Sequence, residues 1–219
     1  MEFSQVNFRS IPICWRSLAT MWDIPARVGR RGIFEDMSGR SFLDLLTSGA
    51  EGWMDPKRDQ VLMGKERHDV GREGDKGYPV RVIRTKEFLY VRNFEPERWP
   101  AGNPETGYTN IDSSPTKTLI LEQHDRGEDH YYNLAMGKRP TEELFKMPDD
   151  HACLNNLAED PAYADVKQKL WQELKQTLEA QKDPRILGNG DIFDTYEYVG
   201  KAPHSWKTYA EGGFHKQSF

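Results

Sequence analysis

Cysteine is scarce in this sequence, with Cys14 and Cys153 the only two among 219 residues. Two cysteines make neither a disulfide framework nor a metal site. A single disulfide between them is one alternative, and we interpret them as two unrelated thiols.

Long apolar runs are also missing. No segment reaches the length of about 20 residues that a membrane-spanning helix requires. The first residues do not match a signal peptide, because Arg9 and Arg16 interrupt the apolar region and no small-residue cleavage site follows. We expect no membrane contact, and the sequence leaves the localisation open.

An excess of positive charge is absent as well. The net charge is −5, and the basic residues are dispersed along the chain, so we expect no nucleic-acid partner. The hydrophobic fraction is 37%, the charged fraction 30% and the mean hydropathy −0.81. A core is possible in a chain this polar, and we expect part of its surface to need a partner.

The clearest local pattern is a β-hairpin. Val80–Arg84 and Leu89–Asn93 are short runs rich in Val, Ile, Leu and Tyr, joined by the polar connection Thr85–Phe88. Gln60–Met63 is a further candidate strand. The intervening segment Lys65–Gly77 is charged and interrupted by glycine, and a loop held by strands at both ends is a common place for functional residues.

A helix is predicted from Pro161 to Lys182. Asp160 suits its N-cap, Pro161 suits its first position, and Asp183–Pro184 ends it. Its apolar residues recur at spacings of three or four, which places them on one face: Tyr163, Val166, Leu170, Leu174 and Leu178. By contrast, residues 95–118 form a proline-rich loop, and the sequence after Arg185 indicates an extended arm lying over another surface.

The order of these segments resembles the C-terminal region of a sulfatase, most closely the bacterial heparan N-sulfatase (sulfamidase) type. The resemblance rests on GKERH after a strand, on GYPVRVIRTKEFLYVRNF, and on the specific run EPERWPAG that follows. It spans about Met37–Pro184, including ELFKM at Glu143–Met147 and NLAEDP at Asn156–Pro161. It implies an α+β fold in which a C-terminal helix packs on a small antiparallel sheet of about four strands, Glu142–Met147 supplying one of them. In a full-length relative this subdomain docks on an α/β domain of the alkaline-phosphatase type.

Three regions follow from the resemblance: a divergent segment 1–36, the sulfatase C-terminal subdomain 37–184 and the tail 185–219. The helix that the family places before the GRSF segment is absent from residues 1–36. We interpret this region as the result of a frameshift or a mis-assigned start.

The chemistry of a sulfatase is not present in this sequence. The family's nucleophile is a formylglycine made within Cys/Ser-x-Pro/Ala-x-Arg. Near matches at Ser10, Ser17 and Ser113 lack the arginine, and Cys14 is followed by Trp-Arg-Ser and does not fit the motif. In the match at Ser113 the fifth position is Lys117, which cannot supply the planar fork of arginine. A calcium site needs several carboxylates, and Asp149–Asp150 is the only adjacent pair of aspartates. We therefore predict no catalytic residue, metal ligand or cofactor here; Ca²⁺ and formylglycine belong to a full-length relative.

Substrate contact is the role that the resemblance leaves to this chain. His68, with Arg67 and Lys65 beside it, could hold an anionic sugar, and Trp99 could stack on one. These four residues are the candidate substrate-binding set, completing a pocket for sulfate-ester or N-sulfate hydrolysis. The partner would be a sulfated carbohydrate, reached through a missing catalytic domain, and full-length relatives are usually periplasmic or secreted. The isolated chain should be inactive.

Two other functions stay open at this stage. The first is a free-standing carbohydrate-binding module for sulfated glycans that uses Trp99 and the His68 loop. The second is a metal-dependent hydrolase built on His124 and His130, although their spacing fits no established ligand pattern. A solvated charged loop is the plain alternative for both histidine-containing segments.

Overall fold

The computed structural model describes residues 43–213, so the predictions for residues 1–36 lie outside the described part. The chain divides into two compact units, Met1–Met54 and Asp55–Phe219. The described part of the first unit contains the short helix α2, Leu43–Thr47. Everything that follows concerns the second unit. The boundaries 1–36, 37–184 and 185–219 stay predictions.

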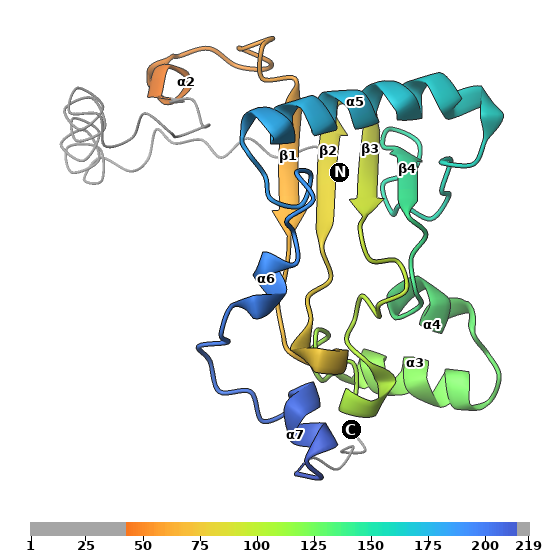
Figure 1. Ribbon diagram of the computed structural model, residues 1–219. Helices are drawn as coiled ribbons and strands as arrows, with labels where there is room; N and C mark the ends of the chain where they lie inside the picture. Colours follow the sequence, from red (N-terminus) through yellow and green to blue (C-terminus); the bar gives the residue numbers. More distant parts are fainter. Residues whose placement is uncertain (1–42, 214–219) are drawn as a thin grey trace. The chain divides into compact units, whose positions relative to one another are not determined.

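A four-stranded antiparallel sheet is the centre of the second unit (Figure 1). Its strands follow each other in chain order: β1 Gln60–Lys65, β2 Val80–Thr85, β3 Phe88–Asn93 and β4 Glu142–Lys146. The hairpin of β2 and β3 closes where the Thr85 hydroxyl accepts the Phe88 N–H at 3.0 Å. The predicted α+β class and the small four-stranded sheet are thus confirmed.

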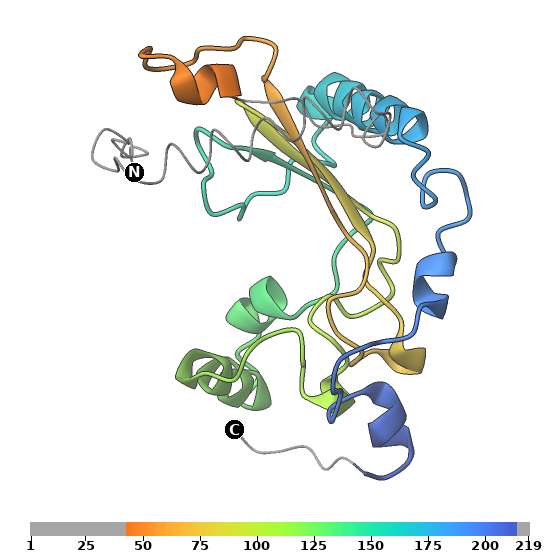
Figure 2. The same cartoon turned by 90° about the vertical axis from the view of Figure 1, so that its left-hand side faces the viewer.

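The helix α5, Ala164–Ala180, follows the 3₁₀ turn Pro161–Tyr163 and lies across one face of the sheet (Figures 1 and 2). The Asp160 carboxylate caps this start by accepting the Ala162 N–H at 2.9 Å. The core between sheet and helix joins Ile83, Tyr90 and Leu144 to Leu170, Leu174 and Leu178. The predicted helix and its apolar face are confirmed.

Strand register explains which side chains reach this core. Leu62, Ile83, Tyr90 and Leu144 stand opposite one another across the four strands and therefore share the face that α5 covers. Their neighbours along the strands point to the other face, where Val61 and Met63 are 58% and 46% exposed and Val82, Leu89 and Val91 are half-buried.

A second core lies below the sheet in Figure 1, around the helices α3, Pro115–Asp125, and α4, His130–Ala135. It buries Ala101, Tyr108, Tyr132 and Met136, and the hydroxyls of the two tyrosines lie 2.8 Å apart. The predicted loop 95–118 was too long, because the Ser114 hydroxyl caps a helix that begins at Pro115 by accepting the Lys117 N–H at 3.1 Å.

The segment after α5 folds back onto its own unit. It contains α6, Ile192–Thr195, and α7, Trp206–Ala210, and the Trp206 N–H donates to the Val70 carbonyl at 2.8 Å. The described part of the tail therefore differs from the extended arm that the sequence indicated. Short, unpatterned helices held by backbone contacts leave no periodic signal in a sequence.

Among the described helices, none is both long enough and apolar enough to cross a membrane.

Candidate functional site

The loop between β1 and β2 carries most of the candidate residues. It closes at its base, where the Tyr78 N–H donates to the Glu66 carbonyl at 2.8 Å. A Cβ on Gly77 would lie 2.6 Å from that carbonyl oxygen, so only glycine fits at this close approach. Within the loop, Glu73–Asp75 forms a 3₁₀ turn in which Gly74 has a φ of 68°.

Arg72 anchors this loop to the segment after β3. Its side chain is 1% exposed and donates from Nε to the Trp99 carbonyl at 2.6 Å and from Nη2 to the Pro100 carbonyl at 2.7 Å. Burial lowers the pKa of Arg72 to about 10, which still leaves it charged at neutral pH. Its Nη1 is buried and has no hydrogen-bond partner among the described residues.

Tyr78 connects Arg72 with Lys65. The Arg72 guanidinium carbon and the Lys65 Nζ lie 5.8 and 5.6 Å from the centre of the Tyr78 ring, within range of cation–π attraction. Tyr78 is 2% exposed, and burial, reinforced by the charge of Glu143, raises its pKa to about 12. Partial desolvation, together with the nearby charge of Arg72, lowers the pKa of Lys65, although much of the Lys65 surface stays exposed.

Trp99 belongs to the same contact set through its backbone, because its carbonyl accepts from Arg72. Its ring is half-buried and packs edge-to-face on Tyr108, with centroids 6.2 Å apart. The Lys138 Nζ lies 5.7 Å from the ring centre. The indole therefore joins the loop to the second core rather than standing free on the surface.

Arg67 and His68 lie apart from that set. Arg67 donates to the backbone carbonyl of Tyr196 and, at 3.4 Å, to that of Asp75, which ties the loop to the C-terminal segment. The side chain of His68 is exposed. The structure thus links Lys65 and Trp99 through Arg72 and Tyr78 and places His68 beside them in sequence, with its side chain in solvent.

Two ion networks fix the loop to the segment that follows α5. The Arg81 guanidinium pairs with Glu66 at 2.6 Å and with Asp183 at 2.8 Å, while Arg185 pairs with Glu66 at 2.8 Å. Arg98 and the backbone N–H of Gly77 share the carboxylate of Asp194, at 3.0 and 2.8 Å. These contacts are well buried, so they position the loop and leave no charge of their own for a ligand.

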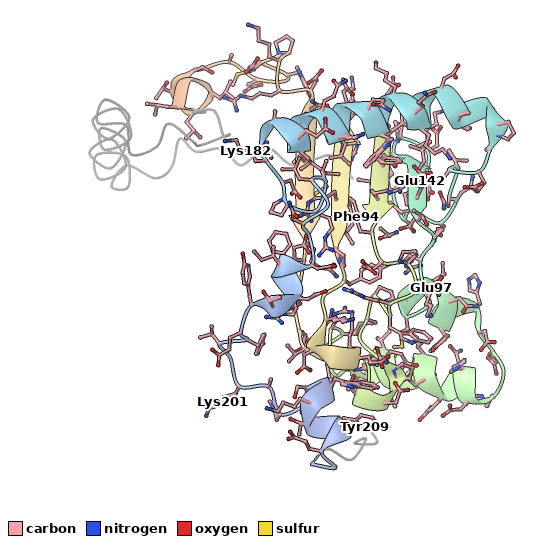
Figure 3. The ribbon with its side chains drawn as sticks, in the orientation of Figure 1. Phe94, Glu97, Glu142, Lys182, Lys201 and Tyr209 are labelled. Atoms are coloured by element: carbon pink, nitrogen blue, oxygen red, sulfur yellow. The ribbon has the colours of Figure 1, made fainter. Side chains whose placement is uncertain are left out.

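A further polar cluster lies between β4 and α5. The Glu142 carboxylate accepts the Tyr90 hydroxyl at 2.6 Å and pairs with Arg92 and Lys167 at 3.4 and 3.5 Å. Figure 3 labels Glu142 on β4, close to α5. Burial disfavours the charged carboxylate, but the Tyr90 hydroxyl and the two cations outweigh it and lower the pKa of Glu142.

The remaining candidates from the sequence have structural roles. Ser114 and Pro115 start α3, and the Lys117 ammonium is buried and donates to the Ile111 carbonyl at 2.8 Å. Asp150 accepts the backbone N–H groups of the turn that follows it, which lowers its pKa.

The histidines of the second alternative function lie in and beside α3 and α4. His124 stacks on Tyr132 with ring centres 3.7 Å apart and pairs through Nδ1 with Asp129 at 2.6 Å. His130 packs against Tyr131. Within residues 43–213, no three His, Cys, Asp or Glu side chains are grouped so as to hold a metal ion. Cys153 has a free thiol.

Sequence reasoning missed the importance of Arg72 and Tyr78. Arg72 stands in the charged segment Lys65–Gly77, where a solvated side chain is the usual outcome, and Tyr78 directly follows that segment. The signal that could have found Tyr78 is its position between Gly77 and Pro79, directly before a strand. For Arg72 the sequence carries no such signal, because its acceptors are backbone carbonyls.

Comparisons with known proteins add a family-level finding. An Ulvan-active sulfatase of Formosa agariphila is 30% identical over 149 residues, which cover 68% of this chain and 26% of that protein. A second Ulvan-active sulfatase of the same organism is 26% identical over 165 residues, covering 73% and 24%. No protein-family model matches the chain. Among solved structures, a 2-O GAG sulfatase is 14% identical with a TM-score of 0.38, covering 75% of this chain and 27% of that one.

These matches show sulfatase-like homology at low identity over part of the chain. The chain spans about a quarter of the length of the curated relatives that it matches.

Proposed function

We propose that this chain is the C-terminal part of a sulfatase, which completes the substrate pocket of a larger catalytic part. The observation that carries the proposal is the match of 149 residues to about a quarter of an Ulvan-active sulfatase. The 219 residues contain no Cys/Ser-x-Pro/Ala-x-Arg motif, so the nucleophile would come from the remaining three quarters. By itself the chain would not hydrolyse a sulfate ester.

The loop between β1 and β2 is the part that would meet the substrate. Lys65 and His68 both have exposed side chains, and an ammonium group and an imidazole are each suited to a sulfate or carboxylate group on a sugar. Arg67 and Trp99 would shape the pocket rather than contact the sulfate, because their polar and aromatic groups are already engaged with protein. Tyr78 and Arg72 would hold the loop in position.

The substrate class is a sulfated polysaccharide. The relatives that carry the proposal are named for activity on ulvan. The resemblance of the loop and hairpin to heparan N-sulfatases favours an N-sulfated sugar instead. Both classes present sulfate groups on a carbohydrate chain, so the two must be compared directly. Ca²⁺ and formylglycine would belong to the catalytic part, and we assign no residue of this chain to either.

A chimaeric enzyme tests the proposal. This chain would replace the matched quarter of the Formosa agariphila Ulvan-active sulfatase, and sulfate release would be measured on ulvan and on N-sulfated glucosamine. We expect the chimaera to release sulfate, while the host without its matched quarter and this chain alone stay inactive. His68→Ala in the chimaera should raise KM with little change in folding, because its exposed side chain supports no internal contact.

Two results would contradict the proposal. The first is metal-dependent turnover by the isolated chain, which would favour the hydrolase alternative. The second is tight binding of sulfated glycans by the isolated chain together with a folded but inactive chimaera, which would favour a free-standing carbohydrate-binding module. An unchanged KM for His68→Ala would remove only the assignment of His68.

A further inference from the structure

The two outer edges of the sheet differ in how their backbone groups are satisfied. On β4, the outward N–H of Leu144 donates to the Asn156 side chain at 2.9 Å, and its carbonyl accepts the Leu157 N–H at 2.8 Å. The Asn156 amide also donates to the Glu142 carbonyl at 3.3 Å. The segment after β4 therefore covers that edge.

The β1 edge has no such cover within the described residues. The Phe94 N–H donates to the Pro79 carbonyl, so the odd-numbered residues of β2 direct their backbone groups to β3 and the even-numbered ones to β1. In the register of β1 with β2, this leaves the N–H and C=O groups of Gln60, Leu62 and Gly64 pointing away from the sheet. None of the three makes a hydrogen bond to another described residue beyond the ladder.

Two of the usual protections of an edge strand, a bulge and a proline, are also missing from β1. Pairing with β2 runs without a bulge over all six residues, and the strand contains no proline. Two of its apolar side chains, Val61 and Met63, are 58% and 46% exposed. A cavity of about 350 Å³ lies beside β1 and is lined in part by Leu62, Leu178 and Phe193. This cavity leaves room for side chains of an added strand.

We propose that β1 pairs with β1 of a second copy of this chain, antiparallel and centred on Leu62, so that the two sheets become one. The sequence around Leu62 is complementary to itself when read in the opposite direction. Asp59 stands opposite the partner's Lys65, Val61 opposite the partner's Met63, and Leu62 opposite the partner's Leu62. Each copy thus supplies one carboxylate and one ammonium, and two ion pairs flank a short apolar centre.

Neighbouring registers are less favourable. A shift by two residues in one direction takes Lys65 away from the partner's Asp59 and toward the partner's Lys57, a like charge in the turn before β1. The opposite shift sets Lys65 against the partner's Val61 and Asp59 against the partner's Arg67, whose guanidinium already donates to the Asp75 and Tyr196 carbonyls. The register centred on Leu62 is therefore the one that uses the charges of both ends, and it directs the outward backbone groups of Leu62 toward those of its counterpart.

Charge reversal tests the register directly. Sedimentation equilibrium of the purified chain should show a reversible monomer–dimer equilibrium. Asp59→Lys alone and Lys65→Asp alone each place like charges on facing strands twice per dimer, so each should weaken association by on the order of tenfold. The double variant Asp59→Lys/Lys65→Asp should restore it. Lys169→Asp, on an exposed position of α5, is the matched control and should associate as the wild type does.

The same variants give the results that would overturn the proposal. The proposal is overturned if the wild type stays monomeric at all concentrations. It is also overturned if the wild type dimerises and neither single substitution weakens the dimer. Association that both single variants weaken but the double variant does not restore would also overturn it, because pairing in this register requires the rescue. Circular dichroism verifies that each variant is folded. Met63→Lys, which adds a charge to the apolar centre, is an independent second variant and should also give monomers.

This inference does not depend on the proposed function. Loss of the dimer would leave the chimaera experiment unaffected, and an inactive chimaera would leave the pairing of β1 intact.

Discussion

Arg72 illustrates how one buried side chain can organise a loop at the scale of a single residue. Its guanidinium fork meets two successive carbonyls, of Trp99 and Pro100, which lysine could not reach with the same geometry. The cost of burying the charge appears in its lowered pKa and is offset by these bonds and by the Tyr78 ring. The exposed residues of the loop depend on this anchor.

Glu142 gives a prediction for pH. Its pKa in the folded chain is below the ordinary value of 4.5, so its ionised form stabilises the fold at higher pH. That contribution is complete above pH 4.5 and is lost as the pH falls through the folded pKa. We expect Glu142→Gln to be less stable than the wild type at neutral pH and the difference to shrink in acid. Urea unfolding of both proteins at intervals of about one pH unit between about pH 3 and pH 7 measures this difference in the free energy of unfolding.

Glu87→Gln is the matched control for this experiment, because Glu87 lies exposed in the β2–β3 turn. Its free energy of unfolding should follow the wild type at every pH. A gap between wild type and Glu142→Gln that stays constant with pH would contradict the assignment of a lowered pKa.

At the scale of elements, α5 shows what a sequence can predict well. Its apolar residues keep a helical spacing, its start has a capping aspartate and a proline, and its burial follows the pattern. The hairpin was predictable for a similar reason, because its runs of β-branched and aromatic residues are bounded by polar connections. Both elements bury one face against the other, so the local and tertiary preferences agree.

The helix α3 shows the opposite case. Its one fully buried side chain is Lys117, while Leu119 is 50% exposed, so the apolar spacing that would identify a helix is absent. Its start depends on a serine cap and a proline that also fit a loop. The sequence therefore indicated a loop up to residue 118, where the structure begins a helix at Pro115.

A substitution at Leu174 tests how much the packing of α5 on the sheet contributes to stability. It is fully buried between the helix and the sheet. Leu174→Ala should lower the free energy of unfolding by about 2–5 kcal/mol, because it removes buried carbon atoms and leaves a cavity. Gln172→Ala, exposed on the same helix, should change it by less than about 0.5 kcal/mol. Equal midpoints for the two variants in urea would show that the helix does not carry the core.

At the scale of the second unit, the sequence named several residues of the candidate site but not how they are joined. Lys65 and Trp99 meet through Arg72 and Tyr78, and the contact between Arg72 and the Trp99 carbonyl spans 27 residues. A hydrogen bond to a backbone carbonyl does not depend on the identity of the acceptor residue, so no residue pattern encodes it. The roles of Lys65, Arg67, His68 and Trp99 in substrate binding stay predictions.

The sheet face opposite α5 gives the last prediction. Val61 and Met63 are exposed there, and Val82, Leu89 and Val91 are half-buried. If a catalytic part normally covers this face, the isolated chain should bind a hydrophobic dye. Replacing Val61 and Met63 with threonine should reduce dye fluorescence, while Leu187→Thr, exposed beyond α5, should not. A monomer that binds no dye at high concentration would count against the fragment interpretation.

The hydrogen bond from the Gly77 N–H to Asp194 joins residues 117 positions apart, and the Trp206–Val70 bond spans a similar stretch of chain. The N-terminus of a chain emerges from the ribosome first, so the β1–β2 loop is synthesised long before the C-terminal segment that fastens it. The sheet and α5 can assemble first from nearer contacts, whereas the loop reaches its final shape only when the last turns of the chain have been made. Termination of translation between α5 and Asp194 would thus yield a protein with the core of sheet and α5 but without the contacts that fasten the candidate site to the C-terminal segment.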